Sequence, residues 1–214
     1  MPHLQSFREF IPIMLQAAVF LDKDGTLLED VSYNVDPSLM RFTKGARKAL
    51  WLLAALPYPL FVISNQAGVA LGHFEHDALQ AVETQLHRMF GECGAKLNGV
   101  YWCPHHPQGT VSRYAIECGC RKPSPGMLLR AAREHQLDLP RSWFVGDILD
   151  DAEAGNRAGC HTVLLDNGHE TQWRKGGSRT PDALASDLLE AAHLVLQRSN
   201  AQLRLAAENR GSVR

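Results

Sequence analysis

Two aspartates with the spacing of a catalytic pair stand near the start of the chain. Asp22 and Asp24 follow directly on a short apolar run, and Gly25 comes next. In an extended chain, side chains two positions apart lie on the same side, and the glycine permits a tight turn. The Asp22 carboxylate can attack phosphorus and form an acyl-phosphate, while Asp24 can donate and accept the proton. An isolated pair of this kind is more commonly a solvated turn, so the other chemical groups matter.

Asp147 supplies a third carboxylate, after another apolar run and Gly146. A carboxylate nucleophile and a phosphate repel each other, so a cation must lie between them. Mg2+ favours carboxylates, phosphate oxygens and water as ligands. It orients the phosphoryl group and offsets charge in the transition state. We therefore expect Asp147 to help hold Mg2+.

Ser64, Arg121 and Lys122 are the candidates for contact with the substrate's anionic groups. The Ser64 hydroxyl and backbone N–H can bind a phosphoryl oxygen. Lys122 can balance the remaining charge, and Arg121 can bind a phosphate or carboxylate through two N–H groups. Taken alone, the basic pair would more commonly be surface charge. The pair lies, along the chain, between a predicted strand that ends before Ser64 and one that ends before Gly146-Asp147. This order favours a catalytic role for the pair.

A second cluster combines cysteines with histidine. Cys103-x-His105 is followed after twelve residues by Cys118-x-Cys120. Three thiolates and one imidazole satisfy tetrahedral Zn2+ and leave no open position, which is the pattern of a structural zinc site. The one-residue gaps are tighter than usual, and buried free thiols are the alternative interpretation. The odd number of cysteines and the lack of an export signal argue against a disulfide framework.

Apolar runs alternate with segments of helical spacing along the chain. We expect buried strands at residues 17–21, 60–63, 99–102, 143–145 and 161–165. Helices are expected at 46–53, at 79–90, from Ser124 as N-cap and Pro125 as first residue to His135, after Asp147, and from about Pro181. This alternation predicts α/β architecture with a doubly wound, Rossmann-like parallel sheet. Because polar clusters follow three of the strands, their side chains should converge where the strands' carboxyl ends form a crevice.

Length and composition predict one domain. The 214 residues suffice for a single well-cored α/β unit, and the formal net charge of −1 provides no field for nucleic acid or an anionic membrane. Pro57 and Pro59 interrupt the most apolar stretch, so no transmembrane segment is expected. We divide the chain into an N-terminal extension (1–16), a catalytic domain (17–198) with a zinc loop (103–120), and a polar tail (199–214) that frays. No signal peptide is evident, so a cytoplasmic location is expected. The protein is also expected to be a monomer.

The motif set resembles that of a known family. Residues 20–26 (Phe-Leu-Asp-Lys-Asp-Gly-Thr), together with Ser64, Lys122 and Gly146-Asp147, resemble the four motifs of the haloacid dehalogenase superfamily of phosphatases. Within it, residues 101–109 and 118–123 are similar to the histidinol-phosphatase group. The resemblance covers residues 17–165. It implies an α/β sheet with a minimal cap made of loops, because the segment from Thr26 to Ser64 is too short for a cap domain.

The resemblance also implies roles for individual residues. It makes Asp22 the nucleophile and Asp24 the acid/base, with Mg2+ on Asp22, the Asp24 carbonyl and Asp147. It places structural Zn2+ on Cys103, His105, Cys118 and Cys120. The implied substrate contacts are Asp30, Val31, Ser32, Tyr33, Ser64, Asn65, Gln66, Ala67, Arg121 and Lys122. The implied reaction removes the 7-phosphate of D-glycero-D-manno-heptose 1,7-bisphosphate, in the supply of activated heptose for lipopolysaccharide or related glycans.

Some positions depart from the family's pattern. Ala67 stands in place of serine, Leu71 in place of arginine and Ile148 in place of lysine, and Val31-Ser32 also differ. All of them lie near the implied substrate contacts and outside the four chemical motifs, so they bear on the substrate and not on the chemistry. Histidinol phosphate or another small sugar phosphate is therefore an alternative substrate. A non-catalytic sugar-phosphate-binding module with a zinc loop is the alternative from another class, but a pure binder needs no nucleophile.

Overall fold

The computed structural model of the chain describes residues 15–174 and 176–211. Residues 1–14, which make up most of the expected N-terminal extension, lie outside this part. So do residues 212–214 at the end of the expected tail. The division of the chain into extension, domain and tail stays a prediction.

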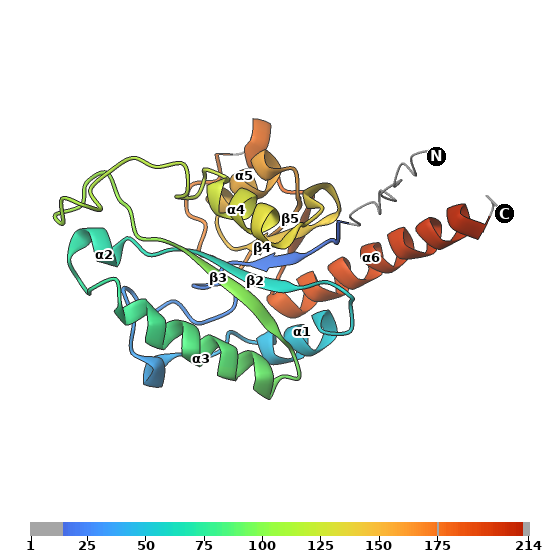
Figure 1. Cartoon of the computed structure of the whole chain (residues 1–214), viewed down its shortest axis with the longest axis horizontal. Coiled ribbons are helices and arrows are strands. Elements are labelled where there is room, and N and C mark those ends of the chain that lie inside the picture. Colours follow the sequence, from blue (N-terminus) through green and yellow to red (C-terminus); the bar gives the residue numbers. More distant parts are fainter. Residues whose placement is uncertain (1–14, 175, 212–214) are drawn as a thin grey trace, which may run out of the picture.

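A six-stranded parallel sheet forms the centre of the molecule (Figure 1). Its strand order is β3-β2-β1-β4-β5-β6, and every neighbouring pair is parallel. The strands are β1 Val19–Leu21, β2 Leu60–Asn65, β3 Leu97–Cys103, β4 Trp143–Gly146, β5 His161–Leu165 and β6 Ala183–Ala185. The first strand lies in the middle, and the chain winds outward from it in both directions. The doubly wound parallel sheet expected from the sequence is therefore confirmed.

Helices cover both faces of the sheet (Figure 1). One face packs against α1 Ala46–Leu53, α3 Ala78–Glu92 and α6 Leu188–Gly211, and the other against α4 Gly126–His135 and α5 Leu149–Ala158. Successive strand residues point to opposite faces. Val19 and Leu21 therefore join the first of these cores, and Phe20 joins the second. Both sides of β1 are buried, which explains its continuous apolar run.

Loops and single turns surround the carboxyl ends of the strands. Between β1 and α1, residues 22–45 contain only the 3-10 turn η1 Pro37–Leu39 as a regular element. The short helix α2 Gly68–Leu71 follows β2, and a long loop follows β3 and leads to α4. Figure 1 shows this loop and α2 at the same end of the molecule. The minimal cap made of loops is thus confirmed.

The start of α4 differs from the sequence prediction. The helix begins at Gly126 with Pro125 as its N-cap, and no side chain caps it. Ser124 was expected to be the N-cap, which is wrong. The backbone N–H of Ser124 donates instead to the carbonyl of Arg121 at 2.8 Å, so residues 121–124 close a turn. That turn places the serine one residue too early to cap the helix.

The C-terminal segment also differs from the prediction. Helix was expected from about Pro181, but Ala183–Ala185 forms edge strand β6 and pairs with β5. Three residues are too few for helical and strand periodicity to be told apart, which explains the error. The helix begins at Leu188 and continues to Gly211, past Ser199, where fraying was expected. Ser199 is buried, and its hydroxyl accepts a hydrogen bond from the Trp143 indole at 3.2 Å.

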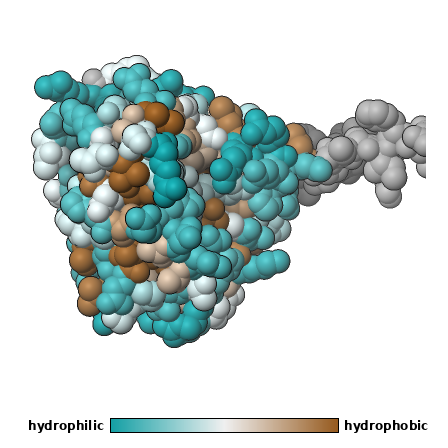
Figure 2. All heavy atoms as spheres, turned by 60° about the vertical axis from the view of Figure 1, so that its left-hand side comes forward, coloured by the Kyte–Doolittle hydropathy of each residue, from teal (hydrophilic) through white to brown (hydrophobic). Residues whose placement is uncertain are grey.

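The surface is mixed in character. Figure 2 shows polar side chains interspersed with small hydrophobic patches on the face it presents. Within residues 15–174 and 176–211, no helix has both the length and the apolar character that a membrane crossing requires.

Candidate active site

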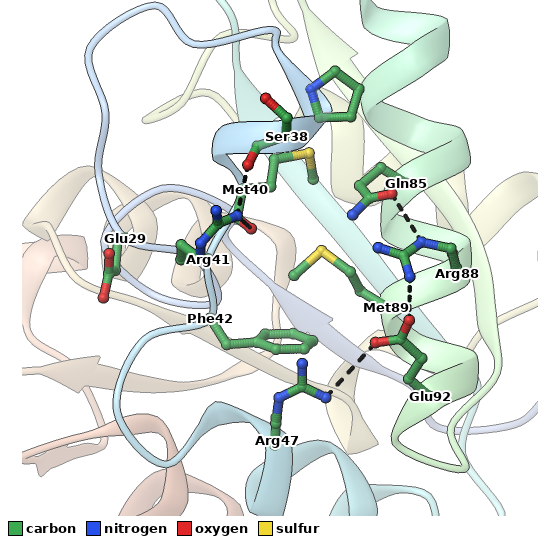
Figure 3. A pocket seen from close by; sticks show the side chains of 11 residues that line it. Glu29, Ser38, Met40, Arg41, Phe42, Arg47, Gln85, Arg88, Met89 and Glu92 are labelled. Atoms are coloured by element: carbon green, nitrogen blue, oxygen red, sulfur yellow. Dashed lines mark hydrogen bonds and ion pairs between the residues drawn. The ribbon is translucent and has the colours of Figure 1, made fainter.

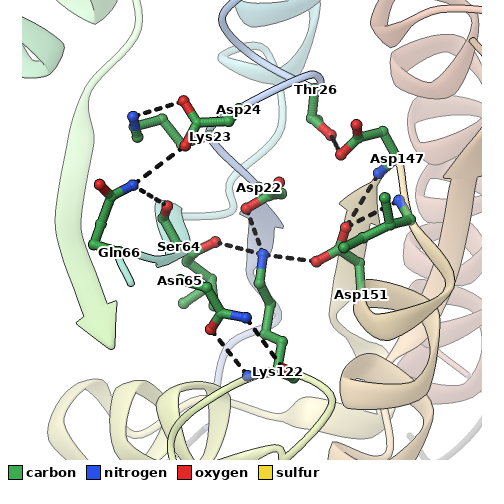
Figure 4. Close-up of polar contacts among 12 residues, drawn as sticks. Asp22, Lys23, Asp24, Thr26, Ser64, Asn65, Gln66, Lys122, Asp147 and Asp151 are labelled. Atoms are coloured by element: carbon green, nitrogen blue, oxygen red, sulfur yellow. Dashed lines mark hydrogen bonds and ion pairs between the residues drawn. The ribbon is translucent and has the colours of Figure 1, made fainter. Parts of the chain in front are cut away.

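A buried ammonium group stands at the centre of the candidate site (Figure 4). Lys122 contacts Asp22, which directly follows β1, and its Nζ lies 2.7 Å from Asp151 Oδ1 in the first turn of α5. It also donates to the carbonyl of Ile63 in β2, at 3.3 Å. All three charged side chains are buried. One lysine therefore ties together two strand ends and a helix start.

The carboxylates outnumber the lysine. Oxygen atoms of Asp22, Asp147 and Asp151 come within 4.8 Å of one another. Burial raises the pKa of Asp22 well above its usual value, against the effect of Lys122, and the neighbouring carboxylates raise it further. Burial and Asp151 raise the pKa of Asp147 to about 7. Burial lowers the pKa of Lys122, but Asp151 and Asp22 outweigh it, and the net shift is upward.

This donor set fits a hard divalent cation. Buried carboxylate oxygens are the ligands that Mg2+ selects, and a cation among them would offset the excess negative charge. Asp151 faces Lys122 with one oxygen and accepts two backbone N–H groups with the other, so Asp22 and Asp147 are the carboxylates best placed to hold the ion. The raised pKa values of Asp22 and Asp147 express the same charge imbalance in the absence of a cation.

Asp151 was not predicted from the sequence. Its Oδ2 accepts the backbone N–H groups of Asp147 and Ile148, both at 3.2 Å, while its Oδ1 faces Lys122. The side chain thus fixes the start of α5 and orients the lysine. Acidic residues are common in the first turn of any helix, so the sequence did not distinguish it from Asp150. A Cβ on Gly146 would lie 2.3 Å from the Asp151 Cβ, which explains the glycine at that position.

Asp24 lies at the open side of the cluster. Lys23 Nζ is 2.7 Å from its Oδ1, and the Gln66 amide donates to its Oδ2 at 3.2 Å. The same Gln66 amide donates to the Ser64 hydroxyl at 2.9 Å. The Asp24 side chain is about one-third exposed, at 32%, whereas Asp22 is buried. This difference suits an acid/base group that meets both a leaving oxygen and water.

Asn65 has a positioning role that its residue type did not reveal. Its Oδ1 accepts the backbone N–H of Lys122 at 3.0 Å, and its Nδ2 donates to the Lys122 carbonyl at 3.1 Å. These two bonds attach the loop before α4 to the end of β2. They hold the lysine backbone in place while its side chain crosses to Asp22.

All the implied substrate contacts except Ser64 line one of two hollows. One, of about 230 Å3, is lined by Asp24, Gly68 and most of the implied set (Asp30, Val31, Ser32, Tyr33, Asn65, Gln66, Ala67). Tyr33, which has a positive φ of 54°, stacks there on His73 with ring centroids 4.0 Å apart. Arg121 lines a second hollow of about 530 Å3 with Lys122 and part of the Cys/His loop. Its guanidinium donates to the His105 carbonyl at 3.4 Å.

The four residues of the Cys/His cluster converge as the spacing predicted. The three Sγ atoms of Cys103, Cys118 and Cys120 lie 3.1 to 3.6 Å apart, and His105 Nδ1 lies 3.3 Å from Cys120 Sγ. These separations are too long for disulfide bonds. Three sulfur ligands and one imidazole fit Zn2+ with no open position. The cluster can therefore hold a structural metal beside Arg121.

The structure adds two contacts to Asp147 that the sequence did not suggest. The Thr26 hydroxyl donates to Asp147 Oδ1 at 3.0 Å, and His169 Nδ1 lies 2.7 Å from Asp147 Oδ2. Thr26 is within the first motif, so its type and position were available as a signal. His169 follows β5, far from any motif, and nothing in its local sequence marks it.

A larger hollow lies away from this cluster (Figure 3). It measures about 640 Å3 and lies between the segment around η1 and helix α3. Its arginines already have partners: Arg47 pairs with Glu92 at 3.7 Å, and Arg41 donates to the carbonyl of Ser38 at 2.7 Å. It contains none of the carboxylates of the Asp22 cluster, so its size does not make it the catalytic site.

Comparison with known proteins points to one family. The family model described as HAD-hydrolase-like matches residues 119–191. A protein of Pasteurella multocida is 39% identical over 155 residues, which cover 72% of this chain and 84% of the relative. A protein of Photorhabdus laumondii is 38% identical over 148 residues, which cover 69% of this chain and 79% of the relative. Both are named D-glycero-beta-D-manno-heptose-1,7-bisphosphate 7-phosphatase. A protein of Burkholderia mallei, 38% identical over 152 residues (71% and 80%), carries the corresponding alpha name.

Solved structures agree with this result. The D,D-heptose 1,7-bisphosphate phosphatase from B. bronchiseptica, complexed with magnesium and phosphate, aligns with a TM-score of 0.73 and 30% identity. The alignment covers 86% of this chain and 99% of that one. A HAD-like phosphatase from Mesorhizobium loti aligns with a TM-score of 0.75 and 31% identity, over 86% and 88% of the two chains.

The charge imbalance at Asp147 predicts how pH and Mg2+ act on stability. Without a cation, the folded protein keeps a proton on this carboxyl up to about pH 7, whereas the unfolded chain releases it near pH 4. The stabilisation from that proton is therefore lost as pH rises through about 7. Mg2+ competes with the proton, so it should raise the thermal midpoint more at about pH 8 than at about pH 5. Differential scanning fluorimetry with and without Mg2+ measures both effects. Equal shifts at the two pH values would contradict the assignment. Asp147→Asn is the matched control, which should lose the part of the pH dependence that Asp147 contributes and leave the part that comes from Asp22.

Proposed function

Since the chain belongs to the haloacid dehalogenase-like hydrolases, in the family of the heptose-1,7-bisphosphate 7-phosphatases, we propose that this phosphatase acts on D-glycero-D-manno-heptose 1,7-bisphosphate. It removes the 7-phosphate and leaves heptose 1-phosphate. The observation that carries the proposal is the buried cluster of Asp22, Lys122 and Asp151, which matches the chemistry named for relatives at 38 to 39% identity.

Asp22 is the nucleophile of the proposed reaction. Its carboxylate oxygen attacks phosphorus, and the bond from phosphorus to the sugar oxygen breaks as Asp24 gives that oxygen a proton. Asp24 then takes a proton from a water that attacks the aspartyl-phosphate, which releases phosphate and restores Asp22. Lys122 offsets negative charge beside Asp22 throughout. Asp22, Asp147 and the Asp24 carbonyl would hold Mg2+, which would orient the phosphoryl group and compensate its charge.

The hollow lined by Arg121 supports a substrate with a second anionic end. The reacting phosphate lies near Asp22, where the Ser64 hydroxyl can donate to it. Arg121 lines the separate hollow beside Lys122 and offers a planar pair of donors for a second phosphate. Leu71 provides no charge for such a phosphate. The relatives' names include both the beta and the alpha anomer, so the anomer is a question for experiment.

Zn2+ in the Cys/His cluster is proposed as a structural ion. It would order the loop between β3 and α4, which has little apolar content of its own, and its binding energy would become local folding energy. Through Cys120 it would also hold the neighbouring Arg121. A role in supplying activated heptose for lipopolysaccharide or related glycans follows from the proposed substrate. The cytoplasmic location, the monomeric state and the absence of nucleic-acid or membrane partners stay predictions.

A phosphate-release screen tests the substrate. Both anomers of the heptose 1,7-bisphosphate should give higher kcat/KM values than histidinol phosphate or hexose monophosphates, and release should require Mg2+. Asp22→Asn provides the background, because a neutral amide is a poor nucleophile and a poor ligand. A higher kcat/KM for histidinol phosphate would make that compound the substrate in place of the heptose bisphosphate. The proposed aspartyl-phosphate mechanism would still hold. A lack of turnover on every phosphate ester would favour a non-catalytic binding module.

Cys118→Ser tests the zinc site. Loss of one thiolate should release Zn2+, loosen the loop over residues 103–120 and raise KM more than it lowers kcat, because the ion lies outside the reacting groups. Metal analysis of the purified protein and steady-state kinetics measure the two effects. Cys160→Ser, at a buried cysteine outside the cluster, should keep its zinc. A wild-type protein that is active and free of zinc would refute the assignment.

Arg121→Ala tests whether Arg121 binds the second phosphate of the substrate while Lys122 serves the reacting phosphoryl group. Losing a charged bidentate contact typically costs about 1.5–3 kcal/mol. We expect that loss in kcat/KM for the bisphosphate and little loss for a heptose monophosphate. Lys122→Ala should impair both substrates, since each brings the same reacting group. Equal losses for Arg121→Ala on both substrates would contradict the assignment of Arg121 to the second phosphate.

A further inference from the structure

Hydrogen bonds attach the loop after β5 to the segments that carry the candidate active site. The Asn167 amide donates to the carbonyl of Gly25 at 2.8 Å, and its Oδ1 accepts the backbone N–H of His169 at 3.3 Å. One residue further, Glu170 Oε2 accepts the backbone N–H of Leu149, the first residue of α5, at 2.7 Å. The loop therefore joins the turn after β1 to the helix that follows Asp147.

His169 is the member of this loop that reaches the candidate metal site. Its Nδ1 lies 2.7 Å from Asp147 Oδ2. In the ionised form that binds a cation, the carboxylate only accepts, so Nδ1 must then carry the hydrogen. The other oxygen, Oδ1, accepts the Thr26 hydroxyl at 3.0 Å. Each oxygen of Asp147 thus has a side-chain donor from a different segment. With both oxygens engaged, the plane of the carboxylate is fixed.

The backbone at Gly25 closes over this contact. A Cβ at position 25 would lie 2.0 Å from Asp147 Oδ2 and 2.3 Å from His169 Nδ1. Only a residue without a side chain leaves the pair room, and the positive φ of 73° favours glycine as well. The carboxylate, the imidazole and the first motif's turn are therefore packed as one unit.

We propose that His169 is a positioning residue, whose N–H holds Asp147 in the orientation in which this carboxylate binds the catalytic cation. The inference rests on the proposed function, because it requires the Asp22 and Asp147 pair to be the Mg2+ site. Groups that hydrogen-bond a metal ligand typically change metal affinity or activity about 10- to 100-fold when they are removed. His169 acts through Asp147, so its loss should appear first as weaker Mg2+ binding.

Mg2+ binding to the full-length, zinc-loaded protein tests the proposal. Isothermal titration calorimetry with Mg2+ alone gives the dissociation constant for the wild type, His169→Ala and His169→Gln. The alanine variant removes the N–H, and we expect its Kd to rise about 10- to 100-fold. The glutamine variant retains an N–H donor and should recover a large part of the affinity. His87→Ala, on the exposed side of α3, is the matched control and should bind Mg2+ as the wild type does.

Thermal midpoints without Mg2+ separate positioning from folding. The His169 side chain is 42% exposed, so both variants should unfold near the wild-type temperature in the absence of Mg2+. An unchanged Kd in His169→Ala, or a glutamine variant as weak as the alanine variant, would overturn the positioning role and leave the proposed function intact. A wild-type protein that binds no Mg2+ would overturn the metal site itself, and this inference with it.

Discussion

The buried ammonium of Lys122 between Asp22 and Asp151 is the interaction on which the rest of the site depends. Removing one partner of such a buried pair typically costs about 3–5 kcal/mol, because it leaves an uncompensated charge. The lysine therefore fixes the end of β1 relative to the start of α5. Its own backbone is held by Asn65 at the end of β2. Three segments that are far apart in the sequence meet through one charge.

The one positive charge of Lys122 does not neutralise the carboxylates of Asp22, Asp147 and Asp151. This excess of negative charge links the structure of the site to its function. Burial and mutual repulsion raise the pKa values of Asp22 and Asp147, which describes a site that binds either protons or a cation. A phosphate brings further negative charge and increases the need for a cation. The Cys/His cluster differs in kind, since its four soft ligands leave no position for substrate. One metal site is thus suited to chemistry and the other to loop order.

Local sequence patterns were enough to predict part of this arrangement. Continuous apolar runs identified the buried strands, and the polar residues directly after them identified Asp22, Ser64 and Asp147. Asp151 was missed because an acidic first turn is ordinary in helices. His169 was missed because its contact with Asp147 depends on how the loop after β5 folds back, which no local pattern encodes. The strand at Ala183–Ala185 was mistaken for helix because its short length carries too little periodicity.

The covalent role of Asp22 is the central claim, and trapping the intermediate tests it most directly. Protein mixed with the bisphosphate and Mg2+, quenched in acid during turnover and digested, should yield a peptide with one phosphoryl group on Asp22. Mass spectrometry of that peptide locates the group, and Asp22→Asn should give no phosphorylated peptide, because a neutral amide is a poor nucleophile. Turnover at the full rate with no phosphoryl group on Asp22 at any quench time, or with the group on another residue, would contradict the account.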